Sequence, residues 1–346
     1  MAGLFDLEFH EKKIKEYQPT LAKLDLVIDW EMFRETIEKA LYVEPKGAGG
    51  GPPFDKIMMF KILILQKYYN LSDEQTEFQI NDRTSFKQFL GLKIGDTIPD
   101  EKTIWHFKEQ LANKDLSKSL FEMFAVALMD KGIIAKEGSI VDATFVDVLK
   151  QRNSKEDNAD IKKGAVPLKF GKKDKNGKQS KLCQKDTDAR WMTKSGEKHF
   201  GFKDHINADE KTKLITKYSV TSAAPHDSTE IENIVDETDN RLHADSAYRS
   251  KEIEEHLKAI ECESFVHEKG YRGSPLTEQQ KESNNKKSKI RARVEHISGF
   301  MTNSMNNALY MRSIGIKRIK ESIGLLNLTY NLFRFEQLIR LEKVKI

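Results

Sequence analysis

The first 131 residues carry apolar side chains at three- and four-residue spacings, a pattern that predicts helices. We expect helices within residues 1–44, over 54–70, over 100–112 and over 116–131. Residues 45–53 hold four glycines and three prolines, which predicts a flexible joint or a tight loop. The amino-terminal third is therefore predicted to be all helical.

Two local signals sharpen this prediction. Ser72 and Gln75 have the spacing of a capping box, which marks a helix start. The helix over 100–112 keeps its apolar residues on one side and leaves Trp105 and Lys108 elsewhere. Short helices that end in one with exposed basic and aromatic residues resemble a helix-turn-helix arrangement, and a plain helical bundle is the alternative.

From Gly138 the apolar pattern changes to period two, which predicts strands. The first strand is expected over 139–149, and runs over 199–209 and 213–223 are expected to form a hairpin. Further strands are expected over 241–245 and 261–268, and further helices over 227–239, 251–260, 291–305 and 316–341.

This order of elements predicts a mixed α/β core flanked by helical parts. We expect a helical N-terminal domain over 1–132, an α/β domain over 133–310 and C-terminal helices over 311–346. Within the α/β domain, residues 150–185 are expected to form a basic loop.

Charge is distributed unevenly along the chain. The net charge is only +4, but residues 150–185 hold twelve Lys or Arg against four Asp or Glu. Residues 281–293 hold six basic residues against one acid. Local basic blocks favour a polyanionic partner such as DNA, and a solvated loop and helix face are the alternative.

Other features exclude several classes of protein. The two cysteines, Cys183 and Cys262, have no zinc-finger spacing and do not suggest a disulfide scaffold. The first residues lack the pattern of a signal peptide, and no apolar run is long enough to span a bilayer. We therefore expect an intracellular protein that does not use a membrane.

The predicted first strand contains two acids, Asp142 and Asp147. Alternate residues of a strand share a face, so the two carboxylates are expected on opposite faces. Asp147 is close to the strand end, where water can solvate it. Asp142 lies among Ile, Val and Phe, where an ionised carboxylate costs several kcal/mol unless a cation or hydrogen-bond donors compensate. A buried structural Asp is the alternative to a catalytic one.

Two more acids have a comparable setting. Asp245 ends a short predicted strand, where catalytic groups of open α/β sheets collect, although a turn-capping role is the simpler alternative. Glu295 follows Arg291 by one helical turn and comes after a densely basic segment. Asp142, Asp245 and Glu295 are hard oxygen ligands, and we predict that they hold two Mg²⁺ ions about 4 Å apart. Mn²⁺ is expected to be able to replace Mg²⁺.

At these acids the chain resembles the DDE transposases of bacterial insertion sequences, in the large group often called IS-five-like. The stretches that carry the resemblance at the acids are SIVDATFVDV, LHADSAYRS and RARVEHISGF, with HFGFKDHINAD as a further strand. The resemblance implies an RNase H-like mixed sheet with flanking helices, preceded by an all-α DNA-binding domain. It also implies that Asp142, Asp245 and Glu295 are the catalytic triad.

The chain departs from the group's signature at two positions. Ser288 and Thr302 stand where the signature often has Tyr and Lys. Those residues are thought to hold the DNA backbone, so Lys287, Lys289 or Arg293 are expected to take their place.

Further residues are predicted to contact DNA on weaker grounds. Trp191 follows the basic loop and suits stacking on an unstacked base, with a core position as the alternative. Tyr248 and Arg249 follow Asp245, with loop packing as the alternative, and His243 is expected to be structural. The complete set of predicted DNA contacts is Arg291, Arg293, Lys289, Lys287, Tyr248, Arg249, Lys203, Trp191, Trp105 and Lys108.

The resemblance implies a Mg²⁺-dependent DNA transposase that binds terminal inverted repeats and catalyses strand cleavage and strand transfer. Double-stranded DNA, as element ends and as target, is the expected partner, and a homodimer is expected because two ends must be joined. We expect the protein in the bacterial cytoplasm, associated with the nucleoid when DNA is bound. Two alternatives are a decayed DNA-binding regulator and an RNase H-like nuclease without strand transfer.

Overall fold

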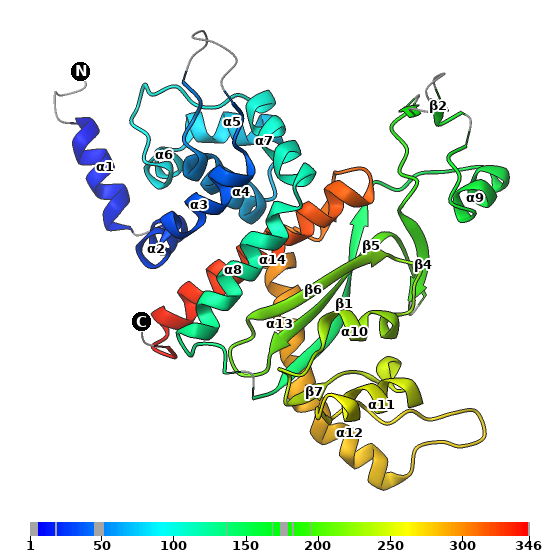
Figure 1. The fold of residues 1–346 in the computed structure, drawn as a ribbon. Helices are drawn as coiled ribbons and strands as arrows, with labels where there is room; N and C mark the ends of the chain where they lie inside the picture. Colours follow the sequence, from blue (N-terminus) through cyan, green and yellow to red (C-terminus); the bar gives the residue numbers. More distant parts are fainter. Residues whose placement is uncertain are drawn as a thin grey trace.

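The computed structural model describes residues 6–17, 19–44, 52–135, 137–167, 169–173, 179–181, 183–194 and 196–344. Helices from the first third of the chain lie at one side, and a twisted sheet with further helices lies at the other (Figure 1). Most of the predicted loop over 45–53 lies outside the described residues. Within the described residues, no helix is long and apolar enough to cross a membrane.

The N-terminal part is helical, as predicted. The capping box at Ser72 and Gln75 is present, and Asp100 caps the helix that carries Trp105. That helix buries its apolar side and leaves Trp105 49% exposed. The helices are α1 (Asp6–Glu16), α2 (Thr20–Val27), α3 (Arg34–Ala40), α4 (Lys56–Tyr69), α5 (Asp73–Asp82), α6 (Thr84–Leu90), α7 (Glu101–Asn113) and α8 (Leu116–Asp130).

The main sheet has the order β4-β5-β1-β7-β8. Its first three strands are antiparallel, and the pairs β1–β7 and β7–β8 are parallel. The predicted hairpin is confirmed as β5 and β6, and β9 pairs with the end of β1. The strands are β1 (Ser139–Val148), β4 (Arg190–Lys194), β5 (Glu197–Asp209), β6 (Ile215–Ser222), β7 (Arg241–His243), β8 (Glu263–Ser264) and β9 (Tyr310–Met311).

Two hydrophobic clusters cover the two faces of the sheet. Ile140 and Val146 of β1 belong to the larger cluster, which also contains the cores of the N-terminal helices and of the last helix. Val141 belongs to the smaller cluster with residues of α10 and α11. The later helices are α10 (Ile231–Ile234), α11 (Lys251–Ala259), α12 (Glu278–Arg291), α13 (Glu295–Gly299) and α14 (Ile316–Arg340).

Helix α14 joins the two parts of the molecule. It lies beside α8, between the N-terminal helices and the sheet (Figure 1). Several of its polar residues are buried, and Asn331 bonds both backbone groups of Ile215 at the start of β6, at 2.9 and 2.8 Å. The side chains of Asn331 and its neighbours therefore complete the hydrogen bonding of a strand that packs against this helix.

Three predictions of local structure between residues 150 and 268 were wrong in part. The basic segment over 150–185 contains helix α9 (Lys155–Lys162) and a hairpin of β2 (Gly171–Lys173) and β3 (Gln179–Lys181). Ser154 and Asp157 form a capping box that starts α9, so a local signal was present but was outweighed by the density of charge.

The other two differences concern length. The helix expected over 227–239 is a 3₁₀ turn, Asp227–Glu230, followed by a helix that ends at Ile234. The strand expected over 261–268 is only two residues long, Glu263–Ser264. Beyond it, the amides of Phe265 and His267 still donate hydrogen bonds to the carbonyls of Leu242 and Ala244. Lengths of elements at a sheet edge depend on partners that local periodicity does not reveal.

Asp204 of β5 leads to a prediction about stability. Its carboxyl group is 1% exposed, accepts a hydrogen bond from Asn327 of α14 at 3.2 Å, and has its pKa raised by burial from 3.8 to about 7. The folded state therefore holds a proton between about pH 4 and pH 7 that the unfolded state has released. Stability from this group is lost as pH rises through that window.

We expect Asp204→Asn to remove this pH dependence. The unfolding free energy of the variant minus that of wild type should increase by up to about 4 kcal/mol from pH 4 to pH 8. Urea unfolding of both proteins at the two pH values measures the difference. A difference that is the same at both values would contradict the assignment.

Candidate active site

Asp142 and Asp147 lie on opposite faces of β1, as strand parity predicts. Asp142 shares its face with Ile140 and Val146, which is the face toward α13 and α14. Asp147 is 37% exposed and lies 3.3 Å from Nδ1 of His199 on the other face. The two carboxylates therefore cannot act on one ion.

Strand pairing brings Asp245 next to Asp142. Strands β1 and β7 are parallel and pair as far as Ile140 opposite His243, and Asp142 and Asp245 each lie two residues beyond this pair, close enough for the charge of Asp245 to act on Asp142. Asp245 also caps the 3₁₀ turn that follows, and its Oδ1 accepts a hydrogen bond from the Ala247 amide at 2.8 Å. Acids more than 100 residues apart in sequence thus become neighbours at the centre of the sheet.

The environment of Asp142 opposes its ionisation. Burial, together with the nearby charge of Asp245, raises the pKa of the Asp142 carboxyl to about 6, and Arg291 acts in the opposite direction. Two carboxylates that share a partly desolvated site repel each other and so destabilise the folded protein. They are a good arrangement for binding a cation.

Arg291 links Asp142 to Glu295. Its guanidinium nitrogens lie 3.6 Å from Oδ1 of Asp142 and 3.6 Å from Oε1 of Glu295. The expected continuous helix over 291–305 is interrupted, because Ala292–Val294 form a 3₁₀ turn before Glu295 starts α13. This turn sets Glu295 beside the sheet, with its side chain 67% exposed.

The three acids do not converge on one point. Among the described residues, no group of three His, Cys, Asp or Glu side chains is close enough to hold a metal ion. Asp142 and Asp245 fit the chemistry of a divalent cation, because they are adjacent hard oxygen donors in a partly buried setting. Glu295 lies apart from them, with its side chain 67% exposed and in contact with Arg291.

His267 is a neighbour of the site that sequence reasoning missed. Its amide donates to the Ala244 carbonyl at 3.1 Å, which carries the edge of the sheet past Asp245. Burial and the charges of Arg291 and Lys287 lower the pKa of the His267 ring. The sequence did hold a signal, because His267 lies near the end of the strand predicted over 261–268. Asp245 was singled out for the same reason, its position at the end of a predicted strand.

Two predicted DNA contacts do not fit the structure, because their side chains are buried. Tyr248 is 1% exposed and belongs to the smaller hydrophobic cluster. Lys203 is 3% exposed, and its Nζ bonds Asp227 at 2.7 Å and the Pro225 carbonyl at 2.6 Å. Neither side chain reaches the surface in this conformation, so both predictions are corrected.

Two others are already engaged within the protein. Lys287 donates to the Val266 carbonyl at 2.8 Å, and Arg249 pairs with Glu254 at 2.9 Å and Glu268 at 3.1 Å. These contacts hold the segment after β8 against α11 and α12. In this structure, Lys287 and Arg249 therefore serve the packing of the segments around the site.

The remaining candidates are accessible. Lys289 and Arg293 are exposed beside Arg291, although Arg293 also bonds the Glu210 carbonyl at 2.9 Å. The core alternative for Trp191 was wrong, since this side chain is 46% exposed and packs through one side on Phe200. Lys108 pairs with Asp73 at the surface of α7, where Trp105 is also exposed.

Comparison with known proteins gives the family. The mixed sheet with flanking helices, with Asp142 on β1 and Asp245 just after β7, has the architecture of the RNase H-like fold. Residues 8–110 match a family model described as a transposase domain (DUF772), and residues 134–332 match one described as a transposase DDE domain. No solved structure matches the chain. The chain belongs to the DDE transposase family, so it is a DNA transposase and DNA is its partner.

Proposed function

We propose that this transposase binds the terminal inverted repeats of an insertion sequence, cuts the strands at their ends and joins them to a target. Asp142, Asp245 and Glu295 are the proposed catalytic acids. The observation that carries the proposal is the closeness of Asp142 and Asp245, which each lie two residues beyond the last pair of β1 and β7 and interact electrostatically, because two neighbouring acids in a partly buried setting are costly unless they bind a cation.

The proposed cofactor is Mg²⁺, bound as two ions, with Mn²⁺ as a substitute. Asp142 and Asp245 would hold it, with Glu295 after rotation toward them. When bound, such ions activate the attacking oxygen and stabilise the leaving oxygen of phosphodiester chemistry. Arg291 is the counter-ion of the acids before they bind metal, and its guanidinium is then available to a DNA phosphate.

The DNA path is proposed to follow the exposed basic residues near Arg291. Lys289, Arg293 and the basic segment over 150–185 are suited to phosphate contacts, which supply affinity without sequence information. Helix α7 is the proposed element for reading bases of the duplex. The chain is further proposed to act as a homodimer in the bacterial cytoplasm, bound to the nucleoid through DNA.

The division of labour along the chain is also a proposal. Residues 1–132 would recognise the ends, residues 133–310 would catalyse the reaction, and residues 311–346 would contribute to assembly. Membership of the IS-five-like group is proposed from the acid-bearing motifs.

Lys289→Ala tests the phosphate path. The variant should weaken DNA binding about equally for all sequences and should reduce the slope of log affinity against log salt by about 1. Anisotropy titrations at several salt concentrations measure the slope. Lys251→Ala, an equally simple change at an exposed residue of α11, is the control and should leave the slope unchanged.

Strand transfer is the decisive test of the proposed function. The purified protein is incubated with Mg²⁺, labelled terminal-repeat DNA and a target plasmid, and joined products are separated on a gel. We expect cleavage and joining. Binding without cleavage would favour the regulator, and cleavage without joined product would favour the nuclease.

A further inference from the structure

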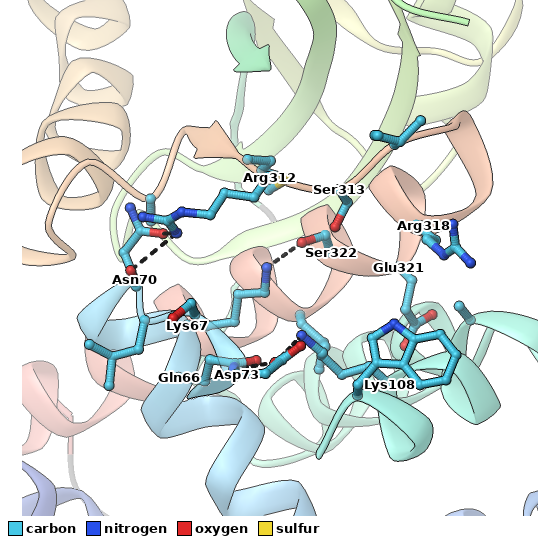
Figure 2. A pocket seen from close by; sticks show the side chains of 18 of the residues that line it. Gln66, Lys67, Asn70, Asp73, Lys108, Arg312, Ser313, Arg318, Glu321 and Ser322 are labelled. Atoms are coloured by element: carbon cyan, nitrogen blue, oxygen red, sulfur yellow. Dashed lines mark hydrogen bonds and ion pairs between the residues drawn. The ribbon is translucent and has the colours of Figure 1, made fainter. Parts of the chain in front are cut away.

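A second site lies between the N-terminal helices and the start of α14, away from the paired acids. It is a pocket of about 500 Å³ that opens among α4, α5, α7 and the segment after β9 (Figure 2). Tyr310 and Met311 of β9 form part of its wall, and they pair with Asp147 and Val148 at the end of β1. Besides Tyr310, the basic and aromatic side chains that line it are Lys67, Trp105, Lys108, Arg312 and Arg318.

Two of these cations are neutralised by acids of the pocket wall. Lys108 pairs with Asp73, and Arg318 makes a two-bonded contact with Glu109 at 2.5 and 2.8 Å. The third acid in the wall, Glu321, accepts hydrogen bonds from Ser117 and has its pKa raised by burial to about 7. The acids of the wall are therefore committed to other groups.

The other two cations have no acid of their own. Lys67 donates to the Ser322 hydroxyl, and Arg312 donates to the side-chain and backbone oxygens of Asn70 at 3.2 and 3.4 Å (Figure 2). Within the described part of the chain, no carboxylate lies within 4.0 Å of Lys67 or of Arg312. Two unneutralised cations thus face one concave space.

The position of Lys67 is unfavourable for an isolated charge. Burial, with smaller contributions from the charges of Lys108 and Arg312, lowers the pKa of its ammonium group to about 7, and Asp73 and Glu321 oppose this effect. A buried lysine of this kind weakens the fold unless an anion completes its environment. The surroundings of Lys67 therefore suit a site that binds an anion from another molecule.

We propose that this pocket takes one nucleotide of an unpaired DNA strand at the element end. Lys67 and Arg312 bind its phosphate, and Trp105 stacks on its base. The inference rests on the proposed function, since it assigns a part of the DNA to a site beyond the acids.

Size and position favour a single strand over a duplex. A volume of about 500 Å³ is in the range of small-ligand sites, roughly 300–1,000 Å³, and is too small for a double helix. Trp105 is 49% exposed in the pocket wall, and stacking on an aromatic ring requires a base that has left the duplex. The wall at β9 is about 20 Å along β1 from Asp142, which is about six stacked base steps.

The test compares two DNA probes. One is a blunt terminal-repeat duplex, and the other carries a short single-stranded tail at the end that is cut. Lys67→Met and Trp105→Leu should each weaken binding of the tailed probe by about tenfold and leave binding of the blunt probe within about twofold. Lys317→Met, an exposed lysine of α14 outside the pocket, is the control and should affect neither probe.

Two further measurements separate the possible outcomes. Lys67→Met should not lower the melting temperature, because it removes a poorly compensated charge, so a binding defect cannot be assigned to unfolding. Inorganic phosphate alone serves as a second ligand for wild type and for Lys67→Met. If phosphate stabilises wild type selectively while both probes bind both proteins equally, the pocket holds a free anion and the DNA assignment is overturned.

Equal loss of both probes would also overturn the inference, because it would make Lys67 a general phosphate contact. The discrimination between probes does not depend on catalysis. If wild type neither cuts nor joins DNA but still prefers the tailed probe through Lys67 and Trp105, the pocket is supported and the proposed function fails separately.

Discussion

Asp142→Asn should abolish strand cleavage, with a loss of at least about 10³-fold, equivalent to about 4 kcal/mol of transition-state stabilisation. The substitution keeps the size of the side chain and removes the negative charge that would bind a cation. It leaves the neighbouring Asp245 as a single acid at the centre of the sheet. Cleavage of labelled terminal-repeat DNA in Mg²⁺ measures the effect.

Asp147→Asn is the matched control, because it makes the same chemical change in the same strand but on the opposite face. Its carboxylate contacts His199 and is remote from Arg291 and Asp245. We expect cleavage within about threefold of wild type for this variant, because it acts outside the proposed site. If the Asp142→Asn protein still cleaves DNA, or if both variants lose cleavage equally, Asp142 is not a catalytic acid.

The melting temperature of Asp142→Asn separates catalysis from folding. Since burial disfavours the charge of Asp142, its removal should not destabilise the protein. An inactive variant that melts well below wild type would indicate a structural role instead.

Gly324→Ala should destabilise the protein by about 2 kcal/mol, although alanine is the better helix former. Gly324 lies in α14 where this helix meets α8 and β6. A Cβ atom at this position would lie 2.4 Å from Oγ of Ser117 and 2.5 Å from the hydroxyl of Tyr218. Both side chains would have to move, and Ser117 would strain its hydrogen bond to Glu321. Urea unfolding measures the free energy.

Gly299→Ala is the matched control. Gly299 is also in a helix, α13, but a Cβ atom there meets nothing within 4 Å. We expect this variant to be neutral or stabilised by up to about 1 kcal/mol. Opposite signs for the two substitutions would establish that close packing of α14 joins the helical part to the sheet. Stabilisation by Gly324→Ala would show that this contact is looser than the structure indicates.

Much of the fold follows from local patterns. The capping box at Ser72, the hairpin of β5 and β6 and the helix of 316–341 were predicted because each depends on periodicity or on residues three or four positions apart. Strand parity alone separated Asp142 from Asp147. These are short-range properties of the backbone, and they survive folding because neighbouring residues are neighbours in any fold.

Accessibility could not be predicted in the same way. Lys203 and Tyr248 have the chemistry of DNA contacts, yet the folded chain buries both. Lys203 is buried because Asp227, which is distant in sequence, neutralises it there. Trp191 shows the reverse, since an aromatic residue for which a core position was the alternative is nearly half exposed. The energy of burying a side chain depends on partners that come from elsewhere in the chain.

The start of α14 is a further case. Its own sequence supplies no side-chain cap, but Asp186 and Asp188 accept hydrogen bonds from the amides of Gly315 and Ile316, each at 2.9 Å. The end of the basic segment is thereby ordered against a helix more than 120 residues away. A helix start that looks unprotected in sequence is satisfied by tertiary contact.

Local sequence was thus enough for the kinds of most elements and for the opposite faces of Asp142 and Asp147, because periodicity acts over a few residues. Only the tertiary structure set Asp142 beside Asp245, put Arg291 between Asp142 and Glu295, and left Lys67 and Arg312 facing a pocket without an acid. These arrangements depend on strand order and helix packing, where segments far apart in the chain compete for the same space and the same counter-charges.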